Sequence, residues 1–204
     1  MGLNIEKRES ITAMFFELFS LCIEACTTVL VAACLLRFYL HYLKINFAPA
    51  SGNPFSHILY PLTNWLIRPL SKIIPFGARI DINSLLASYL LVLVKVLLLQ
   101  ALSNSGHLNI QILVIALFDL FDLALSGLIG LLLVYVIFSW VQTYSPTQEL
   151  FVQMLEPLLK PLRKITPRIS GLDLSALVLM LLIQMSKVIL GHLQMALLTL
   201  LSGL

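Results

Sequence analysis

Two stretches decide the fold of this chain: PLSKIIPFGARIDINSL at residues 69–85 and PLRKITPRISGLDLSAL at residues 161–177. Both contain Pro-Leu-x-Lys-Ile-x-Pro and then an aspartate between two apolar residues. Pro69 recurs 92 positions later (161 − 69 = 92) as Pro161. The same spacing relates Pro54, Pro75, Asp81 and Lys95 to Pro146, Pro167, Asp173 and Lys187. Self-similarity at a fixed spacing is the signature of a tandem repeat.

Upstream of these stretches the spacing grows to 102 (139 − 37 = 102), so that Arg37 corresponds to Ser139 and Glu17 to Asp119. The extra residues fall around KINFAPASG, which is typical of a loop insertion. We therefore predict two repeats, residues 1–105 and 106–204, each crossing the membrane twice and both in the same orientation.

Long apolar stretches place the chain in a membrane. Hydrophobic residues make up 59% of the sequence and charged residues 11%, where a soluble domain carries about a quarter charged residues. Four stretches reach the about 20 residues that span a hydrocarbon core: residues 13–36, 82–102, 110–141 and 172–201. The first contains Glu17 and Glu24 and lacks a small-residue cleavage site, so we read it as a retained helix rather than a signal peptide. The predicted fold is an all-α membrane protein with four transmembrane helices.

The connector inside each repeat, residues 53–75 and 145–167, is predicted to be an amphipathic helix lying at the membrane interface. The second connector opens with Ser145 as N-cap and Pro146 at the first helical position. Its leucines then fall on one face and its charged residues on the other. Internal prolines are expected to kink both helices, at Pro61, Pro69, Pro157 and Pro161.

Basic residues gather in and beside the two connectors. The positive-inside rule then predicts cytoplasmic connectors and both chain termini outside. Lys72, Arg163, Lys164 and Arg168 are expected to contact anionic lipid headgroups or, alternatively, to form a docking surface for a cytoplasmic partner. Binding to nucleic acid is not predicted, because the positive charge is local and the net charge is only +3.

The duplicated motif resembles the YggT family of bacterial inner-membrane proteins. It consists of Pro69, Lys72, Pro75 and Asp81 in the first copy and Pro161, Lys164, Pro167 and Asp173 in the second, with Asn-Pro-Phe ahead of the first. Ser71 stands where the family usually has arginine. The resemblance covers residues 15–200. It implies an inner-membrane location, a link to osmotic or ionic stress and, for plastid relatives, roles in cytochrome assembly and nucleoid organisation. It supplies no reaction.

Charged residues within the spans are costly in lipid and call for a partner or a function. Counted from the connector end at about 1.5 Å per residue, Glu24 and Lys95 lie at similar depth, and Asp122 is within reach of Lys187. We expect two acid-lysine pairs, Glu24 with Lys95 and Asp122 with Lys187. Such pairs fix helix register, form a proton or ion relay, or reflect side chains that snorkel toward the membrane surface.

Asp81 and Asp173 precede the second span of each repeat. A carboxylate at this position caps the following helix and favours its dipole. The alternative is a salt bridge with a connector base such as Arg79 or Arg163.

Signals of catalysis are absent from the sequence. The four histidines lack ligand spacing, and no nucleophile triad, phosphate loop or CxxC occurs. The three cysteines, Cys22, Cys26 and Cys34, share one helix and are read as apolar packing. We therefore expect no enzyme activity, no metal and no cofactor. Two hypotheses remain: a membrane scaffold or assembly factor with membrane-protein partners or further copies of itself, and a small ion transporter or channel component.

Overall fold

The fold is given by a computed structural model, which describes residues 2–45, 56–73, 81–102, 110–141, 146–166 and 173–202. Within these residues the chain is helical and contains no strand. The helices are α1 (Gly2–Tyr42), α2 (Ser56–Ile73), α3 (Ile82–Leu102), α4 (Gln111–Val141), α5 (Pro146–Leu162) and α6 (Leu174–Ser202).

Four helices in the described part of the chain are long and apolar enough to cross a membrane: α1 from Met14, α3, α4 as far as Ser139, and α6. They match the four predicted spans, although α1 continues past residue 36. It continues because Arg37, which looked like a border residue, is satisfied by polar groups of α2 and Asp81. The helix then ends in a Schellman motif, with Lys44 at φ 57° and a 3.0 Å bond from the Ile45 amide to the Leu40 carbonyl.

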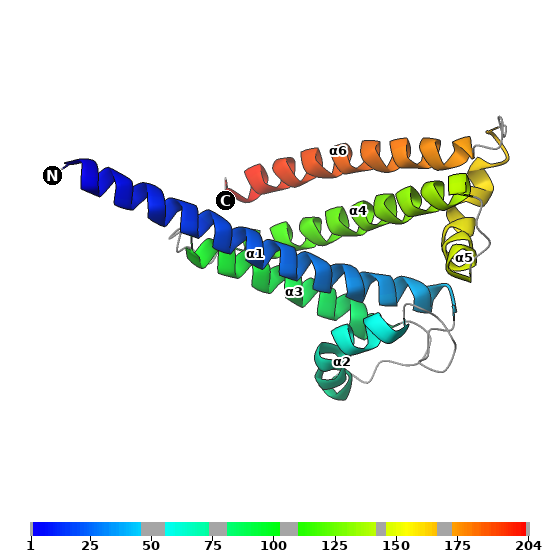
Figure 1. The fold of residues 1–204 in the computed structure, drawn as a ribbon, viewed down its shortest axis with the longest axis horizontal. Helices are drawn as coiled ribbons and strands as arrows, with labels where there is room; N and C mark the ends of the chain where they lie inside the picture. Colours follow the sequence, from blue (N-terminus) through cyan, green and yellow to red (C-terminus); the bar gives the residue numbers. More distant parts are fainter. Residues whose placement is uncertain are drawn as a thin grey trace.

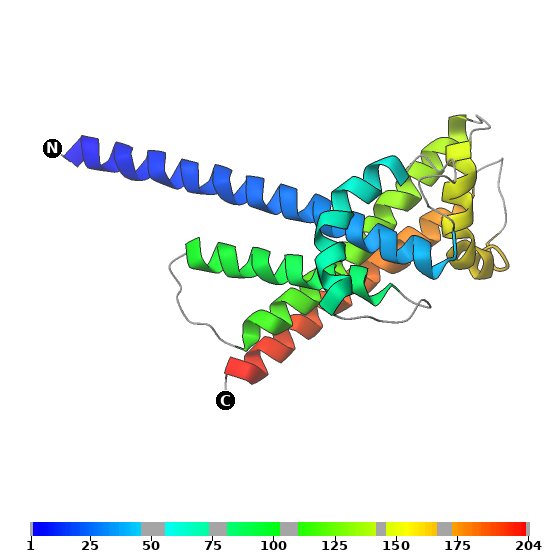
Figure 2. The ribbon, with the colours of Figure 1, turned by 90° about the horizontal axis from the view of Figure 1, so that it is seen from below.

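Among the long helices α1, α3 and α4 pack against one another, and α6 lies on α4. α2 packs against α1 and α3, and α5 against α4 and α6. Figure 1 shows α2 and α5 at the same end of the molecule, with both chain termini toward the other end. In the second view the N-terminal part of α1 extends well beyond the other helices (Figure 2).

The two short helices continue through their prolines, Pro61 and Pro69 in α2 and Pro157 and Pro161 in α5. Both helices change direction along their length (Figures 1 and 2). Proline removes a backbone donor and crowds the preceding turn, which accounts for the bends.

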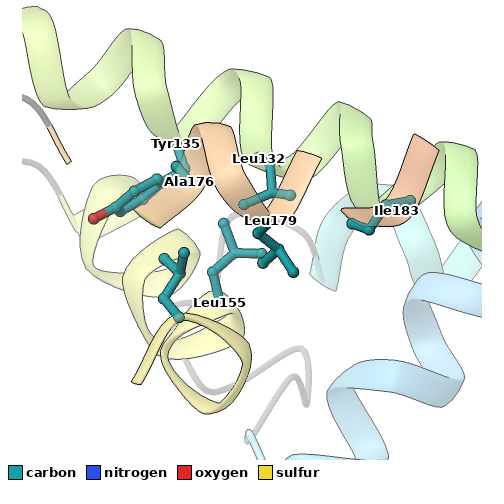
Figure 3. Packing of buried hydrophobic residues seen from close by; sticks show 7 residues of the cluster. Leu132, Tyr135, Leu155, Ala176, Leu179 and Ile183 are labelled. Carbon is teal, nitrogen blue, oxygen red and sulfur yellow. The ribbon is translucent and has the colours of Figure 1, made fainter. Parts of the chain in front are cut away.

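Buried apolar clusters attach the short helices to the spans. In the second repeat the cluster joins α4, α5 and α6 (Figure 3); its members are Leu132, Tyr135, Leu155, Leu159, Ala176, Leu179 and Ile183. A second cluster joins α1, α2 and α5 through Ala33, Leu40, Leu59 and Met154. The Tyr39 hydroxyl also donates a 2.7 Å hydrogen bond to the Met154 carbonyl, which ties the two repeats together at the connector end.

Candidate functional site

Asp173 is the centre of a polar cluster at the start of α6. Its Oδ1 accepts a 3.3 Å bond from the Ser175 amide and a bond from the Ser175 hydroxyl, which caps the helix. Its Oδ2 accepts bonds from Arg163 Nη2 at 2.6 Å, Arg163 Nε at 3.0 Å and the Tyr135 hydroxyl at 3.0 Å. Arg163 Nη2 also lies 2.6 Å from the Tyr135 hydroxyl. One carboxylate therefore joins α4, α5 and α6.

Asp81 forms the equivalent cluster at the start of α3. The Ser84 amide donates to Oδ1 at 3.3 Å and the Ser84 hydroxyl to Oδ2 at 2.6 Å. Arg37 Nε lies 3.3 Å from Oδ2. The same guanidinium donates through Nη1 to Thr63 at 3.1 Å and Asn64 at 3.0 Å. Asp81 therefore connects α1 and α3, while its arginine reaches α2.

Both aspartates thus make the capping contact and a salt bridge at once, where the sequence presented these as alternatives. The arginine comes from a different element in each repeat. Arg37 belongs to the first span, and its counterpart in the second repeat is Ser139. Arg163 follows the connector helix α5, and its counterpart in the first repeat is Ser71. The repeats have exchanged arginine and serine between two positions and kept a guanidinium beside the aspartate.

The pKa of Asp173 is set by opposing effects. Burial acts to raise it, but the hydrogen bonds from Ser175, Arg163 and Tyr135 and the charge of Arg163 hold the pKa below its ordinary value. Burial of Arg163 acts to lower its own pKa, and the contacts with Asp173 and Tyr135 outweigh this and raise it. The pair is therefore ionised throughout the physiological range.

The expected lipid contact of Arg163 is corrected by this geometry. Arg163 lies just past the end of α5, so the polar face of that helix does not predict where its side chain points. The side chain binds Asp173. Lys72 and Lys164 are exposed, as their proposed contact requires. Of the other motif residues, Pro69 and Pro161 lie within α2 and α5. Pro75, Arg79, Ser145, Pro167 and Arg168 lie outside the described residues.

Lys95, deep in α3, is nearly buried and lies 2.6 Å from Asp119 of α4, with side-chain exposures of 8% and 37%. The expectation that Lys95 pairs with Glu24 is therefore wrong: Glu24 is exposed on α1. Depth along the membrane specifies one coordinate of a side chain and leaves open the direction in which it points. The repeat relates Asp119 to Glu17, which lies further from the connector end than Glu24, and so does not assign Asp119 to Lys95.

Lys187, at the corresponding position of α6, contacts α4. It lies 3.3 Å from Asp122, the expected partner, and donates to the Ser126 hydroxyl at 2.7 Å. The side chains of Lys187 and Asp122 are 29% and 48% exposed. Asp119 and Asp122 are three positions apart on α4, so this helix offers one carboxylate to α3 and one to α6.

A half-open cavity of about 610 Å³ lies between α1, α3 and α4. Its walls are apolar and aromatic, including Leu35, Tyr89 and Leu120, and none of its lining residues is charged. Among the described residues no group of three or more histidine, cysteine or acidic side chains is arranged to hold a metal ion. The salt bridges of the described residues thus lie in two capping clusters and two ion pairs between the long helices.

The comparisons with known proteins agree with the repeat. The family model described as CCB3/YggT matches the chain twice, over residues 12–102 and 114–194. An uncharacterised protein in the proC 3′ region of Vibrio alginolyticus is 37% identical over 160 residues, which is 77% of this chain and 84% of the relative. The uncharacterised protein YggT of Escherichia coli K12 is 35% identical over 170 residues, 81% of this chain and 83% of the relative. No solved structure matches the chain.

Proposed function

Because the chain belongs to the CCB3/YggT family of membrane proteins, we propose that it is a non-enzymatic scaffold or assembly factor of the cell inner membrane that contributes to tolerance of osmotic stress. Its repeats would sit in parallel, with cytoplasmic connectors and both termini outside. In this role the bundle holds the connector helices at the membrane surface, where they present a face to other membrane proteins.

The pairing of the deep charges carries this proposal. Each deep lysine has a carboxylate within salt-bridge distance, Asp119 for Lys95 and Asp122 for Lys187. The cavity beside the first pair is lined by uncharged, mostly apolar residues. A path for ions needs polar groups that exchange their partners with the passing ion. Charges that satisfy one another, next to an apolar cavity, suit a bundle whose lysines fix the helix register.

The connector helices support a surface role. Leu59 and Ile67 of α2 and Leu155 and Leu159 of α5 are buried against the spans. Exposed basic residues lie in these helices or just after them: Arg68, Lys72, Lys160 and Lys164. Trp65 and Ile165 are also exposed, 59% and 82% respectively. Basic side chains beside exposed apolar ones at one end of the bundle fit an anionic leaflet surface.

One observation favours an ion transporter as the second candidate. Asp119 and Asp122 are partly exposed and three positions apart on α4, so this helix holds both acids between Lys95 of α3 and Lys187 of α6. Two neighbouring acids flanked by two bases within the spans are groups of the kind from which proton relays are built. In this case the lysines would exchange partners during transport.

Liposome flux separates the two candidates. Purified protein is reconstituted at defined density, and H⁺ and K⁺ flux is compared with that of Lys95→Met and Lys187→Met. We expect flux at the level of empty liposomes for all three proteins. Flux by the unmodified protein that disappears in either lysine variant would overturn the scaffold proposal.

Complementation tests the surface directly. A strain lacking the protein is grown at high osmolarity with variants whose membrane abundance is verified. We expect Lys160→Glu combined with Lys164→Glu to abolish rescue. Gln153→Glu, which adds a negative charge to exposed α5 surface without removing a base, should rescue fully. Full rescue by the double reversal would contradict a function at the basic surface.

A further inference from the structure

The contact between α3 and α4 is one of the places where the two repeats meet, and it joins two of the long helices. It buries Val92 of α3 and Ala116 and Leu120 of α4, which are 0%, 0% and 6% exposed, in a cluster that Val31 of α1 completes. The Lys95–Asp119 ion pair crosses the same contact at 2.6 Å. The last helix of one repeat therefore packs on the first helix of the next through a small apolar patch and one deep salt bridge.

The residues of this contact have counterparts in the other copy of the repeat, on α6 and α1. Positions of α3 recur in α6, 92 residues later, and positions of α4 recur in α1, 102 residues earlier. Val92 corresponds to Gln184, Ala116 to Met14 and Leu120 to Leu18. All three counterparts are exposed, and Met14 and Leu18 are 51% exposed each. The faces that are buried between the repeats are thus uncovered on α6 and on α1.

The charges of the contact recur with the apolar positions. Lys187 corresponds to Lys95, and Glu17 corresponds to Asp119. Lys187 retains 29% side-chain exposure, and Glu17 is exposed. In the described part of the chain the Glu17 carboxylate accepts no hydrogen bond and forms no ion pair. One edge of the molecule therefore carries the base of the contact and the other edge carries the acid.

We propose that two copies of this chain associate through these edges, α6 of each copy packing on the N-terminal half of α1 of the other. Lys187 of one copy lies beside Glu17 of the second copy, as Lys95 lies beside Asp119 within the chain. A twofold axis fills both edges at once and leaves no edge open. The pairing goes beyond the proposed function and does not depend on it.

The fit of the surfaces identifies a second copy as the occupant. Lipid chains cover apolar side chains well but offer no partner to a carboxylate within the membrane. Met14, Glu17 and Leu18 of α1 are exposed, so no described side chain of the same chain covers them. The N-terminal part of α1 extends past the other helices (Figure 2). α6 offers a long exposed apolar surface, including Leu181, Met185 and Val188, next to Lys187.

Cysteine crosslinking tests the contact without removing its charges. In a background with Cys22, Cys26 and Cys34 replaced by alanine, two differently tagged copies are co-expressed, one carrying Gln184→Cys and the other Met14→Cys or Leu18→Cys. Oxidation of the membranes should give disulfide-linked heterodimers. The control is Leu182→Cys. Leu182 is 44% exposed, and its counterpart Leu90 is 38% exposed, so unlike Val92 it is not buried in the contact between α3 and α4. We expect at least fivefold less product from this control.

Association in liposomes then tests the salt bridge. Glu17→Gln should lower the dimer association constant about tenfold, as expected for loss of one interhelical polar contact. Glu24→Gln is the matched control, because Glu24 is also an exposed acid of α1 but corresponds to Ser126, which faces Lys187 within the chain.

Three outcomes would overturn the proposal. The first is equal crosslinking at Gln184 and Leu182. The second is a monomer at every protein-to-lipid ratio, which would mean that lipid alone covers both faces. The third is equal loss of association in Glu17→Gln and Glu24→Gln. A crosslink specific to Gln184 together with a loss specific to Glu17→Gln supports it.

Discussion

The two repeats agree at the connector end and differ deeper in the membrane. At the connector end each repeat caps its second span with an aspartate that also binds a guanidinium, although Arg37 comes from a span and Arg163 from beyond a connector helix. Deeper, Lys95 binds across the boundary between repeats, whereas Lys187 binds within its own repeat. The capping cluster is therefore common to both units, while the deep lysine binds whichever acid its neighbouring helix offers.

The largest expected effect concerns the two deep pairs. Asp119→Leu leaves Lys95, whose side chain is 8% exposed, without its carboxylate and should lower the free energy of unfolding by about 3 kcal/mol. Asp122→Leu should cost about 1 kcal/mol, because Lys187 is 29% exposed and keeps Ser126. Unfolding by SDS in mixed micelles measures both. Equal losses of unfolding free energy in the two variants would show that the greater burial of Lys95 does not make its ion pair more important than that of Lys187.

The next effect tests the exchange of arginine and serine. Arg163→Ser should cost about 2 kcal/mol, less than a fully buried pair, because Arg163 is 24% exposed. Adding Ser139→Arg, which copies the arrangement of the first repeat, should restore at least half of that loss. Thermal stability in detergent provides the measurement.

The control for this exchange is Ser139→Arg alone, which should not stabilise the protein because Asp173 already has its guanidinium. The reverse pair, Arg37→Ser with Ser71→Arg, should behave in the same way in the first repeat. If neither double variant is more stable than its single arginine loss, the two positions are not equivalent sources of the guanidinium.

A smaller effect is expected from the uncharged residues that bind the two arginines. Tyr135→Phe removes the hydroxyl that Arg163 and Asp173 share and should lower stability by about 1 kcal/mol. Tyr135 corresponds to Ala33 in the first repeat, where Thr63 and Asn64 of α2 serve instead. Asn64→Ala should cost less than about 1 kcal/mol, since Arg37 keeps two other partners. A larger loss from Asn64→Ala would reverse the order.

The smallest effect is a dependence on pH. The pKa of Asp173 is lower in the folded protein than in the unfolded chain, so its contribution is complete above the ordinary carboxyl pKa and is lost as pH falls through the lowered folded value. Stability should therefore decline below about pH 4. Asp173→Asn should be less stable at neutral pH and show a shallower decline. Melting curves between pH 3 and 7 measure this, and parallel declines would assign the acid sensitivity to other groups.

Much of the fold follows from local properties of the sequence. The apolar run at residues 82–102 coincides with α3, because length and composition alone decide a span. The first apolar stretch predicts an end at residue 36, before the true end of α1 at Tyr42, because Arg37 resembles a residue at the border of a span. Its partners lie 26 to 44 positions away in the chain, and no local pattern identifies them.

The candidate site was predicted in part. Both capping aspartates could be found because the repeat places them identically before a span. Glu24 was assigned to Lys95 from depth, yet the choice between Glu24 and Asp119 depends on which helices are neighbours and how each is rotated. The exchange of arginine and serine was visible at positions 37, 71, 139 and 163. Only the three-dimensional contacts show that an arginine at position 37 and an arginine at position 163 do the same work. Each binds the capping aspartate of its own repeat.

The bond from Tyr39 to the Met154 carbonyl has a consequence for synthesis of the chain. Its two ends are 115 residues apart, and Leu40 beside it is fully buried against the same part of α5. At about 5 to 20 residues per second, the ribosome needs roughly 6 to 23 s to make the intervening chain. During that time Tyr39 has been made but lacks its partner. A chain that stalls before Met154 therefore leaves a tyrosine and a leucine of α1 without the α5 contacts that cover them in the complete chain, a mark by which unfinished copies differ from complete ones.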